Sequence, residues 1–209
     1  MHRLQLLLAG LVLSTGLGAQ TLSLGVKLGP TWSWQTESCC GEYEPRTGVS
    51  GGLTGSLALS RVFGVQAEVL FAEKGVRGPA GFWMRQGYLE MPILVRATWP
   101  TGRLVSPVLL VGVAPAAELS CSGQTTTFIL FSGGSPPLVP LDCDSMRSFR
   151  RDLGLVASIG ADLAVGRAVW TSELRFTHGT SNLNQAWTSI PEANNRAVVL
   201  MVGVRSARR

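Results

Sequence analysis

Apolar and polar residues alternate along the segment Gln86–Trp99. Leu89 and Ile93 belong to an apolar phase, whereas Tyr88 and Glu90 belong to a polar one. Because successive side chains of a β-strand point to opposite faces, this period of two predicts a strand with one apolar and one polar face. The segment is long enough to cross a bilayer when tilted, which takes about 9–11 residues.

The same alternation recurs along most of the chain. We expect strands at residues 22–34, 47–59, 63–74, 86–99, 105–119, 152–163, 170–177 and 196–205. An unpaired backbone group in hydrocarbon costs several kcal/mol, so strands that cross a membrane must pair on both sides until the sheet closes. The sequence therefore predicts an all-β fold, an eight-stranded antiparallel up-and-down transmembrane β-barrel.

The connections between these segments are alternately long and short. The long ones are residues 35–46, 75–85, 120–150 and 179–194, and all four fall on the side away from the termini. Short periplasmic turns and longer extracellular loops are typical of bacterial outer-membrane barrels. We therefore expect the protein in the outer membrane of a Gram-negative bacterium.

A soluble ligand-binding barrel also has strands with alternating apolar and polar residues, but its composition differs from that of a membrane barrel. The chain is 45% hydrophobic and 15% charged, with 25 glycines among 209 residues. A soluble barrel would expose Lys and Glu on its outer phase, whereas the polar phase here is mostly Gly, Ser and Thr. Small residues suit a crowded lumen, so the apolar phase is assigned to lipid. Four prolines interrupt the strands and each removes a ladder donor, so we expect them at rims or bulges: Pro30, Pro92, Pro107 and Pro115.

The first residues indicate export. His2-Arg3 is basic, Leu4–Leu13 is apolar, and small residues lead to Ala19. This predicts a signal peptide at 1–19 and a barrel domain at 20–209, because the apolar core is shorter than the roughly 20 residues of a membrane anchor. The net charge of +5 is scattered, without a basic patch interleaved with aromatics, so no nucleic-acid partner is expected.

Several strand motifs resemble the PorT-type outer-membrane β-barrel family of Bacteroidota, which carries an outer membrane protein beta-barrel domain. The motifs are Leu24-Gly-Val-Lys-Leu-Gly29, Gln66–Gly75, Tyr88–Arg96, Asp152-Leu-Gly-Leu, Glu173–Asn182 and Val202-Gly-Val-Arg205. The resemblance covers essentially all of the mature chain, and the family also places proline where Pro92 and Pro107 stand. These motifs are signatures of architecture and say little about activity.

Eight charged residues fall on the inward phase. They are Lys27, Glu68, Glu90, Arg96, Asp152, Asp162, Glu173 and Arg175. Such a set suits either a proton or ion path with paired carboxylates, or a salt-bridge network. Eight strands leave an interior just wide enough for side chains, and buried charges persist only when paired. We therefore expect a lumen network of ion pairs.

His178-Gly-Thr-Ser-Asn182 raises an enzymatic alternative. Some eight-stranded outer-membrane barrels are lipid A deacylases that use a His, a Ser two residues later and a carboxylate. Here Ser181 follows His178 by three residues and would point to the other face of a strand. We therefore predict no catalytic residue and no enzyme. The chain has two His, one of them in the expected signal peptide, so no metal and no cofactor are predicted.

All four cysteines lie in the expected long loops. Two arrangements are open: a Cys121–Cys143 bridge that leaves Cys39 and Cys40 free or strained, or two bridges that tie the first loop to the third. We favour the second, because it leaves no free thiol in an oxidising compartment.

The expected function is to present the long outer loops for interaction, or to serve as a scaffold. The 31-residue segment Ser120–Arg150 contains the apolar run Phe128-Ile-Leu-Phe131, which is unusual for an idle loop. A lipid-modifying enzyme and a small pore are the alternatives. The expected partners are outer-membrane lipid and an extracellular or secretion-system protein, with the barrel itself a monomer.

Overall fold

The described part of the chain is almost entirely β-strand. A computed structural model describes residues 22–36, 44–102, 104–126, 137–141, 151–180 and 194–206. Its elements are β1 (Leu22–Thr36), β2 (Glu44–Ala58), β3 (Phe63–Arg77), η1 (Pro79–Gly81), β4 (Trp83–Glu90), β5 (Ile93–Thr98), β6 (Val105–Thr126), β7 (Leu138–Pro140), β8 (Arg151–Val165), β9 (Ala168–Gly179) and β10 (Asn194–Ser206). Within these residues, no helix is both long and apolar enough to span a membrane.

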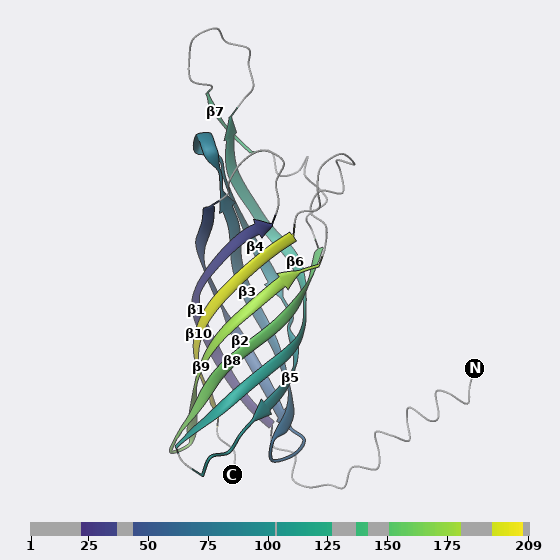
Figure 1. The fold of residues 1–209 in the computed structure, drawn as a ribbon, viewed down its shortest axis with the longest axis vertical. Coiled ribbons are helices and arrows are strands. Elements are labelled where there is room, and N and C mark those ends of the chain that lie inside the picture. Colours follow the sequence, from purple (N-terminus) through teal and green to yellow (C-terminus); the bar gives the residue numbers. More distant parts are fainter. Residues whose placement is uncertain are drawn as a thin grey trace, which may run out of the picture.

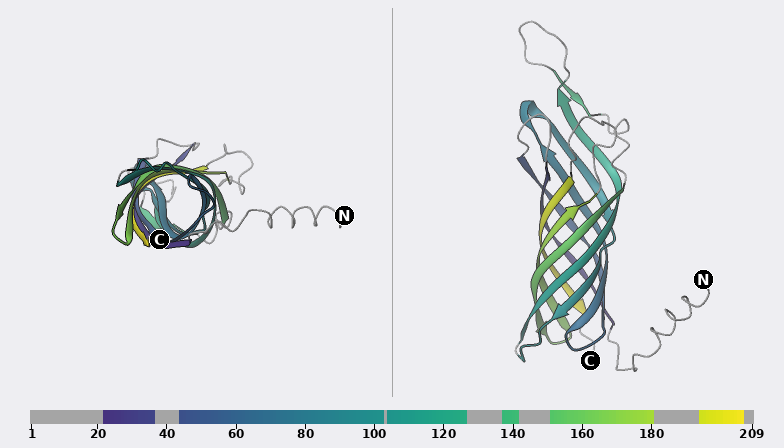
Figure 2. Two further views of the ribbon diagram at one scale, coloured as in Figure 1. Left: turned by 90° about the horizontal axis from the view of Figure 1, so that it is seen from below. Right: turned by 45° about the vertical axis from the view of Figure 1, so that its right-hand side comes forward.

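The strands close into a ring. Each strand is antiparallel to its neighbours, and β1 pairs with both β2 and β10. β4 and β5 together form one strand of the wall. Both pair with β3 and β6, and the register is the same before and after Met91 and Pro92. With β7 paired only to β6 in a short hairpin, the wall has eight strands, and Figure 2 shows the closed ring end-on. The predicted eight-stranded antiparallel barrel is confirmed.

The registers fix the stagger of the barrel. One circuit through directly paired residues leaves β1 at Trp34 and returns to β1 ten residues earlier, at Leu24. The steps between them are Arg196, His178, Leu155, Val113, Ile93, Ala67 and Gly55. With about 3.3 Å per residue and about 4.8 Å between strands, this shear tilts the strands by about 40° from the barrel axis. Each step to the next strand then descends about 3 Å, and each residue along a strand changes the level by about 2.5 Å.

The alternation predicted from sequence is the division between lipid and lumen. Apolar side chains of the outer phase are exposed, as Leu24 (63%) and Ile93 (56%) illustrate. Polar and charged side chains of the inner phase are buried, including Lys27 at 4% exposure. This inversion of the usual soluble pattern is stable only where hydrocarbon surrounds the wall.

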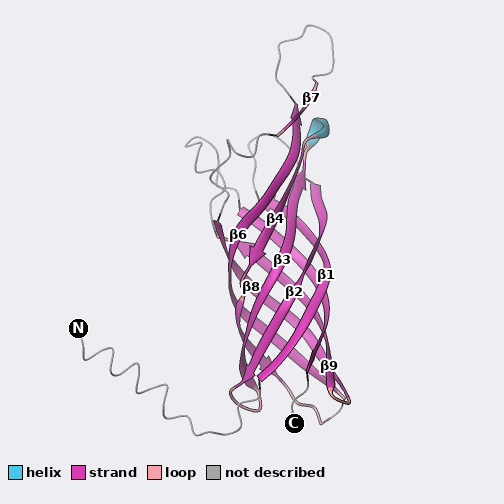
Figure 3. Cartoon of the chain, turned by 180° about the vertical axis from the view of Figure 1, so that it is seen from behind, coloured by secondary structure: helices cyan, strands magenta, loops and turns pink. Residues whose placement is uncertain are grey.

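The start of β1, the end of β10 and the short turns lie at one end of the barrel. The other end carries the long connections, and there β3, β4 and β6 rise above the rest of the wall (Figures 1 and 3). The strands on this side are longer than the alternation predicts: β3 continues to Arg77, β4 begins at Trp83 and β6 continues to Thr126. Backbone pairing persists beyond the apolar belt, because ladder hydrogen bonds do not require apolar side chains. By the asymmetry of outer-membrane barrels, this taller end is extracellular.

Two central prolines, Pro92 and Pro115, lie in the sheet without the bulges that we expected. The Glu68 N–H donates to the Pro92 carbonyl at 3.0 Å, and the Met91 N–H donates to the Pro115 carbonyl at 2.8 Å. The registers of β3 and β6 do not shift at either proline. Each proline therefore removes one donor and leaves the rest of the ladder in place.

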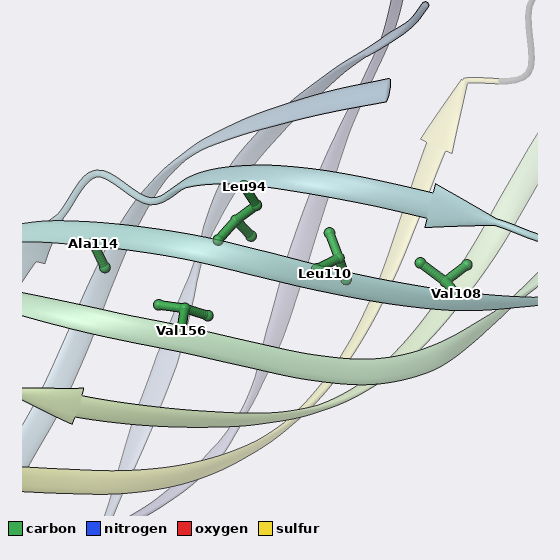
Figure 4. Packing of buried hydrophobic residues seen from close by; sticks show 5 residues of the cluster. All are labelled: Leu94, Val108, Leu110, Ala114 and Val156. Atoms are coloured by element: carbon green, nitrogen blue, oxygen red, sulfur yellow. The ribbon is translucent and has the colours of Figure 1, made fainter. Parts of the chain in front are cut away.

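Part of the lumen is lined by aliphatic side chains. Leu94 of β5, Val156 of β8 and three β6 residues form a buried cluster, which Figure 4 shows from close by. The β6 members are Val108, Leu110 and Ala114. A smaller cluster joins Leu70 of β3 to two residues of β10, Val199 and Met201. The remaining lumen side chains are mostly polar or charged, and they form the candidate site.

Candidate functional site

Four charged side chains meet in the middle of the lumen. Lys27 Nζ of β1 lies 2.6 Å from Glu68 Oε1 of β3 and 2.7 Å from Glu173 Oε2 of β9. Arg175, also on β9, donates from Nη1 to Glu68 Oε2 at 2.8 Å and from Nε to Glu173 Oε1 at 2.7 Å. Each carboxylate is thus shared by two cations, and each cation by two carboxylates. Such reciprocal pairing is what permits four charges to be buried together.

A second cluster lies closer to the periplasmic end. Asp162 Oδ2 of β8 accepts from Arg96 Nη2 of β5 at 2.5 Å and from Arg205 Nη2 of β10 at 2.7 Å. Gln66 of β3 joins the two clusters, because its amide oxygen accepts from Arg96 at 2.7 Å while its amide nitrogen donates to Glu68 at 2.5 Å. The polar network is therefore continuous across the lumen and involves six strands, β1, β3, β5, β8, β9 and β10.

The structure brings six of the eight sequence-predicted lumen residues into this network. They are Lys27, Glu68, Arg96, Asp162, Glu173 and Arg175. Of the other two, Glu90 pairs with Lys74 at 2.5 Å, and Asp152 is buried near Gly179 on the extracellular side of the lumen.

Three members of the lumen set were missed by the sequence analysis. Gln66 and Lys74 share the inward phase of β3 with Glu68, and Arg205 lies on the inward phase of β10 with Met201. The same period-two signal marks all three positions. Gln66 carries no charge and Arg205 lies in a basic tail, so charge alone did not distinguish these two residues. Lys74 is the last residue of the expected strand 63–74.

The packed network leaves little open volume. The cavity between Lys27, Gln66 and Asp162 measures about 10 Å³, which is about enough for one water molecule. On the periplasmic side a vestibule of about 300 Å³ opens below Arg96 and Arg205. The vestibule is therefore a shallow cup whose floor is the ion-pair network.

His178 lies on the outer face of the wall. It shares the phase of the exposed residues Trp170, Leu174 and Phe176, and its Nδ1 accepts from Arg196 Nε at 3.2 Å. Thr180, two residues later, donates its hydroxyl to the Leu153 carbonyl at 2.8 Å. Ser181 lies outside the described residues. The Thr180 hydroxyl is thus engaged by a backbone carbonyl. In the described part of the chain, no group of three or more His, Cys, Asp and Glu side chains is arranged to hold a metal ion.

One of the four cysteines falls within the described residues. Cys121 lies near the extracellular end of β6, paired with Gln86 of β4, and it is disulfide-bonded. Cys39, Cys40 and Cys143 lie outside the described residues. The pairing pattern stays a prediction.

A closed eight-stranded wall with an apolar exterior and a charged, filled interior can be compared with known proteins. A family model of the outer membrane protein beta-barrel domain matches residues 18–185. The chain belongs to this family. The protein is accordingly an outer-membrane β-barrel of a Gram-negative bacterium, as the alternating loop lengths predicted.

Solved structures of low sequence identity share the fold. The neisserial surface protein A, NspA, is 12% identical, with 88% of this chain and 96% of that chain covered and a TM-score of 0.50. OprG from Pseudomonas aeruginosa is 13% identical, with 90% and 97% covered and a TM-score of 0.50. A weaker similarity, with a TM-score of 0.43, is to the outer membrane enzyme PagL, which is 10% identical, with 85% and 97% covered. A comparison with curated protein sequences gave no match.

Proposed function

We propose that the protein is a non-conducting outer-membrane barrel that serves as a scaffold for its extracellular segments. The observation that supports this role is the lumen network, in which Lys27, Arg175 and their two carboxylates fill the middle of the barrel. A conducting lumen would need a continuous column of water, and the cavity at this level has space for about one water molecule. The barrel wall then supports the extracellular segments that connect its strands.

Planar-bilayer recording tests the absence of conduction. We expect no stable single-channel current from the wild-type protein. The double variant Glu68→Ser/Arg175→Ser removes one side chain of each sign from the middle of the lumen and should allow transient currents. Arg167→Ser is the matched control, because Arg167 is exposed on the β8–β9 turn and lines neither the network nor the vestibule. A stable wild-type conductance that Arg167→Ser leaves unchanged would instead assign the small-pore function.

We further infer that the barrel is not an enzyme. The hydroxyl of Thr180 is committed to the Leu153 carbonyl, and Nδ1 of His178 is engaged by Arg196. Neither group is arranged as a nucleophile and base would be. Incubation of the folded protein with lipid A, followed by mass spectrometry of the acyl chains, provides the test. Deacylation by the wild type that disappears in His178→Ala would replace the scaffold by the lipid-modifying alternative.

The partner that we propose for the scaffold is an extracellular or secretion-system protein, bound by a monomeric barrel of the PorT type. The support is the tall extracellular wall, where β6 continues to Thr126 and pairs with β7, and the apolar run 128–131 between them in sequence. The run itself lies outside the described residues. Light scattering of the detergent-solubilised protein should give one chain per micelle; a dimer mass would contradict the monomer.

For the cysteines we propose two bridges between the first and third extracellular segments. The support is that Cys121 is disulfide-bonded and that this arrangement leaves no free thiol. Peptide mapping of the non-reduced protein should recover Cys121 joined to Cys39 or Cys40. A fragment that holds only Cys121 and Cys143 would reject this arrangement.

A further inference from the structure

Two basic side chains face outward where the apolar belt ends on its extracellular side. Arg196 shares the outer phase of β10 with the exposed residues Leu200 and Val202. His178 shares the outer phase of β9 with Phe176. Both positions therefore point toward lipid, and not into the lumen where the other charges of these strands lie.

Their level along the barrel axis follows from the registers. Arg196 is paired with Trp34, and His178 is paired with Arg196. Each step descends about 3 Å, so both basic groups lie within about 6 Å of the level of Trp34. On the same geometry Trp99, at the periplasmic edge, lies about 30 Å below Trp34. The two side chains are therefore at the outer membrane–water interface, where lipid headgroups begin.

The pair is arranged as a donor site. Arg196 Nε donates to His178 Nδ1 at 3.2 Å, which assigns the imidazole proton to Nε2 and leaves the two terminal guanidinium nitrogens for another acceptor. Among the described residues, no carboxylate forms an ion pair with Arg196. Trp34 flanks the pair from β1, and its ring lies 6.5 Å from that of Phe176. Phe176 lies two residues below His178 on β9, and the Trp34 ring approaches it, so an aromatic surface adjoins the outward N–H donors. This arrangement suits a ligand that has acyl chains next to a phosphate.

The charge around this edge is asymmetric. Arg151, on the outer phase of β8, lies at about the level of Trp34 by the same stagger, and it is exposed. At this level of the outer face, the carboxylate of Glu73 is already paired with Arg85. The periplasmic edge instead presents exposed aromatic residues, which are Phe63, Trp99 and Trp170. Among the described residues, the outward-facing cations of the strands that lack an ion pair thus lie at the extracellular interface, whereas the exposed periplasmic cations Arg61 and Arg167 lie on turns.

We propose that Arg196 and His178 bind a phosphate group of a phosphorylated glycolipid in the outer leaflet. A guanidinium fork matches two phosphate oxygens, and a neutral imidazole Nε2–H supplies a further donor. The acyl chains lie along Phe176 and the apolar belt beneath it, and the Trp34 ring flanks the headgroup. Arg151 provides a second, more distant positive charge for the same headgroup. This site is independent of the lumen and of the scaffold role.

Binding of purified lipid A to the folded full-length protein in neutral detergent provides the test. The probes are diphosphoryl lipid A and its dephosphorylated form, followed by native mass spectrometry. The variants are Arg196→Gln and Arg196→Lys, with Arg61→Gln as the control at the opposite end of the barrel. One interfacial cation contributes about a fivefold change in affinity, so Arg196→Gln should weaken binding of diphosphoryl lipid A about fivefold. Arg196→Lys should retain part of that affinity, and Arg61→Gln should match the wild type.

Three outcomes would overturn the proposal. Equal affinity for the dephosphorylated lipid would mean that phosphate is not recognised. Equal losses in Arg196→Gln and Arg61→Gln would assign any effect to net charge and not to this site. Complete competition by millimolar inorganic phosphate, with no preference for the lipid, would make the pair a free-anion site. Arg196→Lys keeps the charge and about the same length. Its affinity for diphosphoryl lipid A therefore still tests the site where Arg196→Gln lowers the folded fraction.

Discussion

Substitution of Arg175 by methionine tests the energetic role of the lumen network. Arg175 is 2% exposed and contacts both central carboxylates, with Glu68 at 2.8 Å and Glu173 at 2.7 Å. Methionine retains much of the aliphatic volume but removes the charge and every donor. Glu68 and Glu173 would then share the single ammonium group of Lys27. The variant therefore leaves one buried negative charge without a counterion.

The expected cost is large on the scale of protein stability. Breaking a buried ion pair by removing one partner costs about 3–5 kcal/mol, because the remaining charge stays desolvated. A folded domain is stable by only about 5–15 kcal/mol, so the variant would lose a substantial fraction of its free energy of unfolding. Arg175→Met/Glu68→Gln removes the excess carboxylate as well, and it should recover about 1–3 kcal/mol of the loss.

Urea unfolding in lipid vesicles, with the folded fraction read from heat-dependent gel mobility, measures these differences. Arg61→Met is the control, since Arg61 is exposed on a turn and should stay within about 0.5 kcal/mol of the wild type. A loss below about 1 kcal/mol for Arg175→Met would refute the reasoning, because it would mean that water compensates Glu68 and Glu173 in the lumen. Failure of Glu68→Gln to recover any stability would refute the assignment of the cost to the excess carboxylate.

Two further substitutions test the wall. Ile93 faces lipid about midway between the levels of Trp34 and Trp99, so Ile93→Lys should cost about 2–4 kcal/mol in the same urea assay, whereas Thr47→Lys at the outer rim should cost at most about 1 kcal/mol. Equal costs would contradict the assigned membrane level. Gly29 lies against the Leu200 carbonyl at the closing β1–β10 seam, so Gly29→Ala should lower the yield of heat-modifiable barrel; Gly55→Ala, whose nearest neighbour would be Leu24 Cδ2 at 3.4 Å, should fold like the wild type, and indistinguishable yields would refute the close packing.

The fold is predictable from sequence because the barrel wall depends on a two-residue period. Eight segments carry that period, and the apolar phase of each is the exposed phase of the structure, as Leu24 and Ile93 show. The extent of β3, β4 and β6 was not predictable in this way, because their outer ends leave the apolar belt while backbone pairing continues. Pro92 was misjudged for a related reason: a proline in the ladder removes one donor, and the register can continue past it.

The lumen site is predictable only in part. Alternation assigns Lys27, Glu68 and Arg175 to the interior, since each falls on the inward phase of its strand. It gives no information about which of them meet, because β1, β3 and β9 are not all neighbours in the ring. Partners across the lumen depend on the level of each residue along the axis, and the level depends on register. Gln66 joins two clusters for the same reason, although it has no charge to mark it.

The ion-pair network also favours one strand register over others. By the stagger of the strands, Lys27, Glu68 and Glu173 lie within about 3 Å of one level, although they come from three different strands. A two-residue slip of β3 against β2 would keep every side chain on its own face, so alternation would not oppose it. The slip would move Glu68 by about 5 Å along the axis, away from Lys27 and Arg175, and leave buried charges unpaired. The ion pairs therefore distinguish between registers that the hydrophobic pattern leaves equivalent.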